Sequence, residues 1–341
     1  MIPEAKLQEI RNYLKKAENP LFFYDDDCDG LCSYLLLKKY TNNSKGVIVK
    51  APPELDVSFY RKVEENSPDL IIVLDKPKIS QDFIDKVHVP ILWIDHHGPY
   101  PMKGVHYYNP LNYDKDDSSP VTYWSYKISK TSLWIATVGS VADNFIPEFI
   151  DDFIDKYPKV LDKVKEPLKI LYETNLGKLI KIMSFLLKGK TSEVYNNINI
   201  LNKIEDPTEI LEGETPRAKF LLKKFEKINK VYNQVLEKAL DQVKKEKLFV
   251  FIYPSSKISL SRDLANELLY KLPDKIILVA REKDDNMRIS MRSKSINLQK
   301  LLEKALFNVD GYGGGHEFAV GGNITKKDFN KFINNIKKEV K

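Results

Sequence analysis

The chain of 341 residues has little cysteine, a small net charge and no long hydrophobic run. Its two cysteines exclude a disulfide scaffold and favour a reducing, cytoplasmic location. No apolar stretch approaches the roughly 20 residues that a membrane span needs, and the charged N-terminus is unlike a signal peptide. We therefore expect a cytoplasmic protein without a membrane partner. The net charge of +6 fits an anionic partner but does not establish one.

Four short apolar runs in the first 110 residues predict buried strands. They are 21–24, 46–49, 70–74 and 89–94. Each run is too short and too continuously apolar for an amphipathic helix, as expected of strands buried on both faces of a parallel sheet. Helical stretches at 31–40, 57–65 and 80–87 separate the runs, which gives a βαβ series and predicts a doubly wound α/β domain.

The rest of the chain changes character twice. Strand signals vanish over 151–246, where apolar residues at steps of three and four predict one long amphipathic helix at 217–246. The α/β pattern then returns, with the following expected strands and helices: strands 248–253, 276–280 and 287–291, and helices 264–272, 298–306 and 326–341. The predicted fold is therefore α/β, with a parallel-sheet domain at 1–150, a helical connector at 151–246 and a smaller Gly-rich α/β domain at 247–341.

Acidic residues follow three of the four apolar runs. Asp25, Asp27 and Asp29 lie in a segment with four carboxylates in five residues, which repel one another unless cations neutralise them. Asp75 ends the next strong run, and Asp143 ends a later apolar stretch. A solvated acidic loop or ordinary helix caps are the alternative explanation for these residues.

Two adjacent imidazoles strengthen the metal hypothesis. His96 and His97 follow Asp95 at the end of the last apolar run. His and Asp ligands together suit Mn²⁺, Zn²⁺ or Co²⁺ better than Ca²⁺. Ligands drawn from several strand ends can hold two cations, which would lower the pKa of a bound water and support hydrolysis of a phosphate ester.

Glycine is scarce and unevenly distributed. Six of the 14 glycines fall within residues 311–322, around Gly313-Gly314-Gly315-His316. A loop of this composition lets backbone N–H groups approach an anion, and the alternative is a plain flexible turn. The imidazole of His316 favours the binding role, because a turn does not need one.

These elements, taken in order, resemble the DHH phosphoesterase superfamily. The matching residues are Asp25-x-Asp27-x-Asp29-Gly30, Asp75, Asp95-His96-His97, Asp143 and Gly314-Gly315-His316-x-x-Ala319-x-Gly321. The form of the first motif, Asn109-Pro110 after the third and the long connecting helix are similar to the RecJ-like branch. Many archaeal relatives have His at the position of Asp25, which leaves the metal identity open.

The resemblance implies a role for each matching residue. Asp25, Asp27 and Asp75 would hold one divalent cation, and Asp29, Asp75, His96 and Asp143 a second, with Mn²⁺ favoured and Mg²⁺ or Co²⁺ as alternatives. His97 would contact the scissile phosphate or the attacking water, and Asp95 would orient the His pair. Gly313, Gly314, Gly315 and His316 would bind the substrate's phosphate or terminal nucleotide across an interdomain cleft. Arg292 matches the family's Ser-x-Arg element and would grip a phosphate.

The leading hypothesis is a metal-dependent exonuclease on single-stranded DNA or RNA that releases nucleoside monophosphates. The chain resembles archaeal RecJ-like and Hef-associated single-strand exonucleases, which favours 3′→5′ polarity, a role in DNA repair or replication and a helicase partner. Region 151–246 is the expected surface for such a partner or for a homo-oligomer. Relatives with the same motifs give a second hypothesis, a nanoRNase, a 3′-phosphoadenosine phosphate phosphatase or a cyclic-dinucleotide phosphodiesterase. A non-catalytic replication scaffold is the third.

Overall fold

The computed structural model describes residues 1–50, 54–100, 102–254 and 258–340, which form two compact units. The first unit contains residues 1–187 and 191–222, and the second contains 188–190 and 223–341. No helix within the described ranges is both long enough and apolar enough to cross a membrane. The three-part organisation expected from composition stays a prediction.

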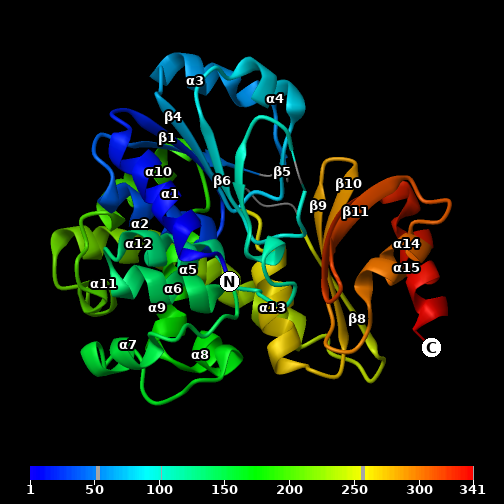
Figure 1. The fold of residues 1–341 in the computed structure, drawn as a ribbon. Helices are drawn as coiled ribbons and strands as arrows, with labels where there is room; N and C mark the ends of the chain where they lie inside the picture. Colours follow the sequence, from blue (N-terminus) through cyan, green and yellow to red (C-terminus); the bar gives the residue numbers. More distant parts are fainter. Residues whose placement is uncertain (51–53, 101, 255–257, 341) are drawn as a thin grey trace. The chain divides into compact units, whose positions relative to one another are not determined.

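The first unit is built on a five-stranded parallel sheet. Its strands, in spatial order, are β2 (Lys45–Val49), β1 (Pro20–Asp25), β4 (Leu70–Leu74), β6 (Ile91–Ile94) and β7 (His106–Tyr108). Figure 1 shows β1, β4 and β6 side by side. The chain runs from β1 to β2 on one side and then returns to β4 on the other, which creates a switch point between β1 and β4. The predicted α/β parallel-sheet fold is confirmed, and β7 is an additional short strand.

Both faces of this sheet are covered by helices. On one face, alternate strand residues such as Phe23, Val73 and Trp93 pack with side chains of α3 (Tyr60–Asn66) and α4 (Gln81–Lys86). The helix α2 (Cys28–Tyr40) packs against β1 and β4, and also against α5 (Val121–Ser129) and α6 (Leu133–Ala142). Burial on both faces explains why the strand sequences are continuously apolar.

Shorter elements complete the first unit. Those before residue 150 are α1 (Glu4–Lys16), β3 (Glu54–Leu55), η1 (Val57–Phe59), β5 (Lys78–Ile79) and η2 (Pro110–Asn112). The following helices of this unit are α7 (Ile150–Lys156), α8 (Pro167–Glu173), α9 (Asn175–Leu186), α10 (Thr191–Leu201) and α11 (Pro207–Glu212). The long helix α12 (Pro216–Leu240) begins in the first unit, and its residues from 223 onward belong to the second.

The long helix expected at 217–246 is α12, but its predicted end is wrong. The helix ends at Leu240, and Val243 N–H bonds to the carbonyl of Leu240, three residues back. Such shorter bonds are typical of a terminating turn. The segment from 244 to 247 offers only charged side chains, so no apolar contact extends the helix further.

The second unit contains a five-stranded mixed sheet. Its strands, in spatial order, are β11 (Gly311–His316), β12 (Ala319–Thr325), β10 (Asn286–Arg292), β9 (Ile276–Lys283) and β8 (Leu248–Tyr253). Only the β8–β9 pair is parallel. The helix α13 (Ser261–Lys271) packs against β9 and β10.

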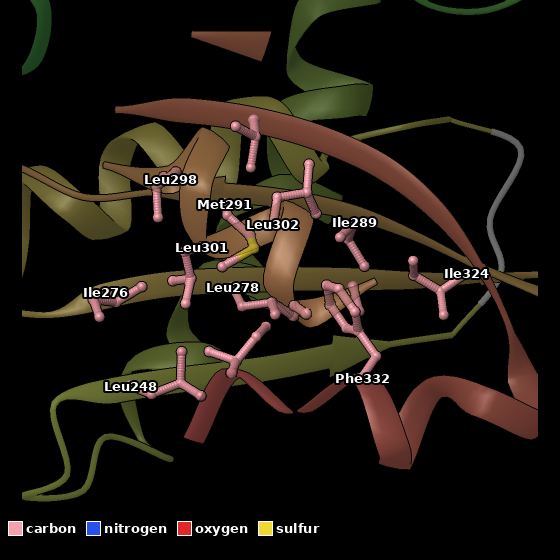
Figure 2. Close-up of a cluster of buried hydrophobic side chains, with 14 of the residues drawn as sticks. Leu248, Ile276, Leu278, Ile289, Met291, Leu298, Leu301, Leu302, Ile324 and Phe332 are labelled. Atoms are coloured by element: carbon pink, nitrogen blue, oxygen red, sulfur yellow. The ribbon is translucent and has the colours of Figure 1, made fainter. Parts of the chain in front are cut away.

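One face of the mixed sheet forms the core of the second unit. Alternate residues of β9, β10 and β12, among them Leu278, Met291 and Ile324, pack against α14 (Leu298–Ala305) and α15 (Lys326–Glu339), as Figure 2 shows. The expected helices at 298–306 and 326–341 correspond to α14 and α15, and Lys341 lies outside the described residues.

The Gly-rich segment is a strand rather than the predicted loop. Residues 311–316 pair in antiparallel register with β12 and form an edge of the sheet. Close packing explains the glycine at position 313. A Cβ there would lie 2.7 Å from the carbonyl oxygen of Gly321 and 2.9 Å from a methyl of Leu302. The low β propensity of glycine favours a loop for this segment. Pairing with β12 and close packing against α14 nevertheless stabilise a strand.

The second core can be tested separately because all three tryptophans lie in the first unit. Leu278 is completely buried, so Leu278→Ala should destabilise the second unit by about 2–5 kcal/mol. In urea, the circular dichroism transition should move to lower denaturant while the tryptophan fluorescence midpoint changes little. Phe307→Ala, at a residue 72% exposed, is the control and should change stability by less than about 0.5 kcal/mol. An unchanged circular dichroism transition in Leu278→Ala would contradict this core.

Candidate functional site

Three strands of the first unit present a carboxylate at their carboxyl ends. Asp25 is the last residue of β1, Asp75 follows β4 and Asp95 follows β6. Hydrogen bonding to the neighbouring strand continues one residue past the ends of β4 and β6. Asp75 N–H donates to Ile94 O, and Asp95 N–H donates to Tyr108 O. The three acids therefore lie at one edge of the sheet, beside the switch point.

The turn from β1 into α2 adds a further carboxylate. Asp27 is the N-cap of α2, and its side chain accepts a hydrogen bond from Gly30 N–H. A Cβ at position 30 would lie 2.6 Å from the carbonyl oxygen of Asp25, so the helix begins this close to the strand only with glycine there. Carboxylate oxygens of Asp25, Asp27 and Asp75 lie within 4.8 Å of one another.

Asp29, in the first turn of α2, is buried and anchored. Its two carboxylate oxygens accept hydrogen bonds from Val121 N–H (2.9 Å) and Thr122 N–H (2.7 Å) at the start of α5. Amide donors at a helix N-terminus stabilise a negative charge. Asp29 therefore joins α2 to α5, a structural role that the sequence did not indicate. Its Oδ2 also lies 4.0 Å from His96 Nε2.

Asp75 has an unusual backbone. Its φ of 56° lies in the left-handed region, which costs a non-glycine residue roughly 1 kcal/mol or more. Its side chain is 3% exposed and points toward His96, with 3.4 Å between Asp75 Oδ1 and His96 Nε2. A strained backbone and a buried acid at the end of a strand are typical of a functional position.

The histidine pair is fixed by hydrogen bonds. His97 Nδ1 lies 2.8 Å from Asp95 Oδ1, and the backbone N–H of His97 donates to Asp95 Oδ2. The side-chain amide of Asn109 donates to His97 O (2.8 Å) and to the hydroxyl of Tyr107 (2.7 Å). This arrangement fits the predicted orienting role of Asp95, because a buried carboxylate partner fixes the ring position of an imidazole.

His96 lies where the carboxylates converge. Its Nε2 is 3.4 Å from Asp75, 3.7 Å from Asp143 and 4.0 Å from Asp29. Ligand atoms gather in three overlapping groups that could hold a metal ion: Asp25, Asp27 and Asp75; Asp75, His96 and His97; Asp29, His96 and Asp143. The structure thus brings together all eight predicted residues of the first unit, and the sharing of Asp75 and His96 permits neighbouring cations.

The carboxylates repel one another in this buried setting. Burial, followed by the charge of Asp27, raises the pKa of Asp25 to about 6. Burial also raises the pKa of Asp29 to about 7, although His96 opposes the shift, and it raises the pKa of Asp75 well above its usual value. Burial is the largest influence on His97 and alone would lower its pKa, but the hydrogen bond and charge of Asp95, together with the charges of Asp143 and Asp27, raise it overall. Oxygen and nitrogen donors with this excess of negative charge fit divalent cations.

Lys76 is the site residue that the sequence analysis missed. Its ammonium lies 2.6 Å from Asp25 Oδ1, and the side chain is only 2% exposed. The indole N–H of Trp93 donates to the backbone carbonyl of Lys76, which holds the main chain after β4. The signal in the sequence was a lysine directly after a strand-end Asp, which is normally a solvated residue.

The predicted substrate-binding residues lie in the second unit. Arg292 of β10 is opposite Ala319 of β12, which is opposite His316 of β11, so the three form one row across the sheet. Side chains of directly opposed residues project from the same face. Arg292 Nε lies 2.5 Å from Asn266 Oδ1, and Nη1 donates to Met291 O, so its guanidinium is positioned by its neighbours.

One face of the edge strand β11 is open, and the carboxyl end of the strand is held by hydrogen bonds. A Cβ on Gly314 would meet nothing within 4 Å, and Tyr312, two residues away on the same face, is 67% exposed. At the tip, Glu317 O accepts from Leu298 N–H, and Gln299 Nε2 donates to Gly315 O. The His316 backbone is therefore held by strand pairing on one side and by α14 next to its tip.

Two family models match the chain. The DHH family, N-terminal domain, matches residues 21–157, and the DHHA1 domain matches residues 245–341, so together they cover more than half of the sequence. No curated protein sequence gives a significant match.

Solved structures share the fold along almost the whole chain. RecJ from Thermus thermophilus in complex with Mn²⁺ is 16% identical, with a TM-score of 0.69 over 98% of this chain and 53% of RecJ. An exonuclease RecJ bound to manganese is 13% identical, with a TM-score of 0.68 over 98% and 93% of the two chains. PggH, a pGpG-specific phosphodiesterase from Vibrio cholerae, is 17% identical, with a TM-score of 0.51 over 95% and 99%. The chain thus spans about half the length of the Thermus protein.

The raised carboxyl pKa values predict how the metal-free protein responds to pH. The folded state keeps protons that the unfolded chain releases near its usual Asp pKa, so stability should fall as pH rises from about 4 to about 7. Asp75→Asn removes one of the crowded ionisable carboxyls, and Asn tolerates the left-handed backbone at this position. We expect its melting temperature without metal at pH 7.5 to rise by about 2–4 °C.

Thermal melts with a chelator at pH 5.5 and 7.5 check this prediction. The wild type should lose more stability between the two pH values than Asp75→Asn, while Mn²⁺ should stabilise the wild type more. Asp116→Asn, at an exposed position, is the matched control. Equal pH dependence in the wild type and Asp75→Asn would contradict the proposed repulsion.

Proposed function

We propose that this chain, which belongs to the DHH phosphoesterase superfamily and is RecJ-like in its domains and fold, is a metal-dependent exonuclease. Its substrates would be single-stranded DNA or RNA, which it would degrade to nucleoside monophosphates. The observation that carries the proposal is the convergence of carboxylates and imidazoles around Asp75 and His96 at the carboxyl ends of β1, β4 and β6. A role in repair or replication and 3′→5′ polarity form part of the proposal.

The first unit would supply the chemistry. Two divalent cations would be held by the oxygen and nitrogen donors of Asp25, Asp27, Asp75, Asp29, His96 and Asp143. Bound cations supply a nucleophile near neutral pH, by lowering the pKa of water, and offset the charge that develops on the phosphate. Mn²⁺ is favoured because the donor set mixes carboxylates with imidazole and because similar RecJ structures contain it.

His97 would act on the scissile phosphate. Its Nδ1 lies 2.8 Å from Asp95 Oδ1, and we assign the contact with a phosphate oxygen or the attacking water to the opposite ring atom, Nε2. Because this hydrogen bond raises the pKa of His97, the ring holds a proton at higher pH than an ordinary histidine does. A proton at Nε2 would donate a hydrogen bond to a negatively charged oxygen.

The second unit would bind the substrate strand. Arg292 and His316 lie in one row on one face of the sheet, with the small side chain of Ala319 between them. A guanidinium and an imidazole spaced by one strand can contact the same phosphate or neighbouring phosphates. Tyr312 is exposed on the strand that carries His316 and could stack against a base.

A phosphodiesterase that acts on dinucleotides is the second candidate. It is favoured by the fold shared with PggH over nearly the full length of both chains. Initial rates on a dinucleotide and on an end-labelled strand of about 20 nucleotides, both with Mn²⁺, distinguish the two. Hydrolysis of the dinucleotide alone would reject the exonuclease proposal, and the ladder of products from the labelled strand reports polarity.

Removing the central carboxylate should abolish hydrolysis. Asp75 belongs to two of the three candidate ligand groups, so Asp75→Asn should lower kcat on single-stranded DNA with Mn²⁺ by about a thousandfold or more. Far-ultraviolet circular dichroism should remain that of the wild type. Asp116→Asn should keep full activity, and substantial turnover by Asp75→Asn would show that the centre is wrongly assigned.

The His316 imidazole should contribute to substrate binding rather than to chemistry. His316→Ala should raise KM for single-stranded DNA about tenfold with a small change in kcat and in Mn²⁺ binding. His88→Ala, at an exposed histidine outside both sets of site residues, is the matched control and should behave as the wild type. A loss confined to kcat would contradict the binding role.

A further inference from the structure

The ammonium of Lys76 lies inside the candidate metal centre. It is 2.6 Å from Asp25 Oδ1, and the lysine side chain is 2% exposed whereas that of Asp25 is 19% exposed. Lysine is rarely buried, and a buried ammonium is stable only when it is paired. This cation therefore belongs to the local charge balance of the carboxylates, where the sequence suggested only divalent metal ions.

Two of the three groups of candidate ligands share no residue, and they differ in the nitrogen that lies beside their carboxylates. In the group of Asp25, Asp27 and Asp75, the Lys76 ammonium already contacts one carboxylate. In the group of Asp29, His96 and Asp143, the nitrogen facing the carboxylates is an imidazole Nε2, at 4.0 Å and 3.7 Å. An imidazole can donate a lone pair to a metal ion, whereas an ammonium has no lone pair and repels it.

We propose that Lys76 makes the two cation positions unequal. The position at His96 fills first, and the position at Asp25 fills only at higher metal concentration because its cation competes with the ammonium. Lys76 is thus a positioning residue that holds Asp25 when the weaker position is empty. This inference rests on the proposed metal-dependent function and concerns metal binding alone.

The physical basis is repulsion between like charges at short range. A divalent cation bound by Asp25 would lie within a few ångströms of the Lys76 ammonium, and the buried surroundings screen that repulsion poorly. Displacement of the ammonium would break its contact with Asp25 and require another partner for a buried charge. Either route weakens cation binding at this position, whereas Asp25, the carboxylate that the ammonium contacts, is not among the ligands of the group of Asp29, His96 and Asp143.

Counting bound Mn²⁺ without substrate tests the inference. Free Mn²⁺ can be measured by electron paramagnetic resonance during titration of the metal-free, full-length protein. The wild type should bind two ions in steps whose Kd values differ by at least about tenfold. In Lys76→Met, the weaker step should tighten by about tenfold and approach the stronger one. Lys76→Arg keeps the charge and should retain unequal steps.

Lys78→Met is the matched control, because Lys78 is an exposed lysine whose ammonium lies over the Tyr100 ring, 5.1 Å from its centroid. Its titration should be that of the wild type. Thermal melts give a second measurement: without metal, Lys76→Met should be less stable than the wild type because Asp25 loses its partner, and Mn²⁺ should raise its melting temperature more.

The outcomes separate this inference from the proposed function. Two equal Mn²⁺ steps in the wild type would overturn it, and this result does not depend on whether Lys76→Met folds. An unchanged weaker step in folded Lys76→Met would overturn it as well. No Mn²⁺ binding by the wild type would reject the metal centre and the inference together. Unequal steps without hydrolysis of any nucleic acid would support the inference and reject the exonuclease proposal.

Discussion

Repulsion among buried carboxylates is the constraint on which the first unit depends. The parallel sheet places Asp25 and Asp75 at neighbouring strand ends, and burial there raises the pKa of both acids. The backbone adds strain, since Asp75 has a left-handed φ. Such an arrangement persists only because apolar strands packed on both faces hold the backbone in place, so the stability of the sheet and the unfavourable charges of the site oppose each other.

In the second unit, strand pairing fixes the positions of the predicted substrate-binding residues. His316 lies on an edge strand whose pairing with β12 fixes the register to Ala319 and from there to Arg292. Gly313 permits close packing of this strand, because a neighbouring carbonyl and a leucine leave no room for a Cβ. A strand fixes side-chain spacing more accurately than a flexible loop, which suits a row of residues that would contact a regularly spaced backbone.

Most of the fold could be predicted because its signals are local. Continuous apolar runs indicated β1, β2, β4 and β6, and acids after such runs pointed to the edge of the sheet where the site lies. The contacts that refine the site are not local. Lys76 meets Asp25 across 51 residues of sequence, and Asp29 meets Thr122 across 93. The Gly-rich strand was also unpredictable, because its pairing partner and α14 override the low β propensity of glycine.

The charge of the chain gains meaning once the site is located. The net charge is +6, and the carboxylates of Asp25, Asp27, Asp29, Asp75, Asp95 and Asp143 are included in it. Without these six acids, the remaining residues carry a formal charge of +12, so bound cations would leave a strongly basic protein. Such a charge favours a polyanionic substrate through long-range attraction, while a concentrated patch of negative charge would retain the cations. The modest total charge is therefore the sum of a concentrated acidic site and an excess of basic residues elsewhere in the chain.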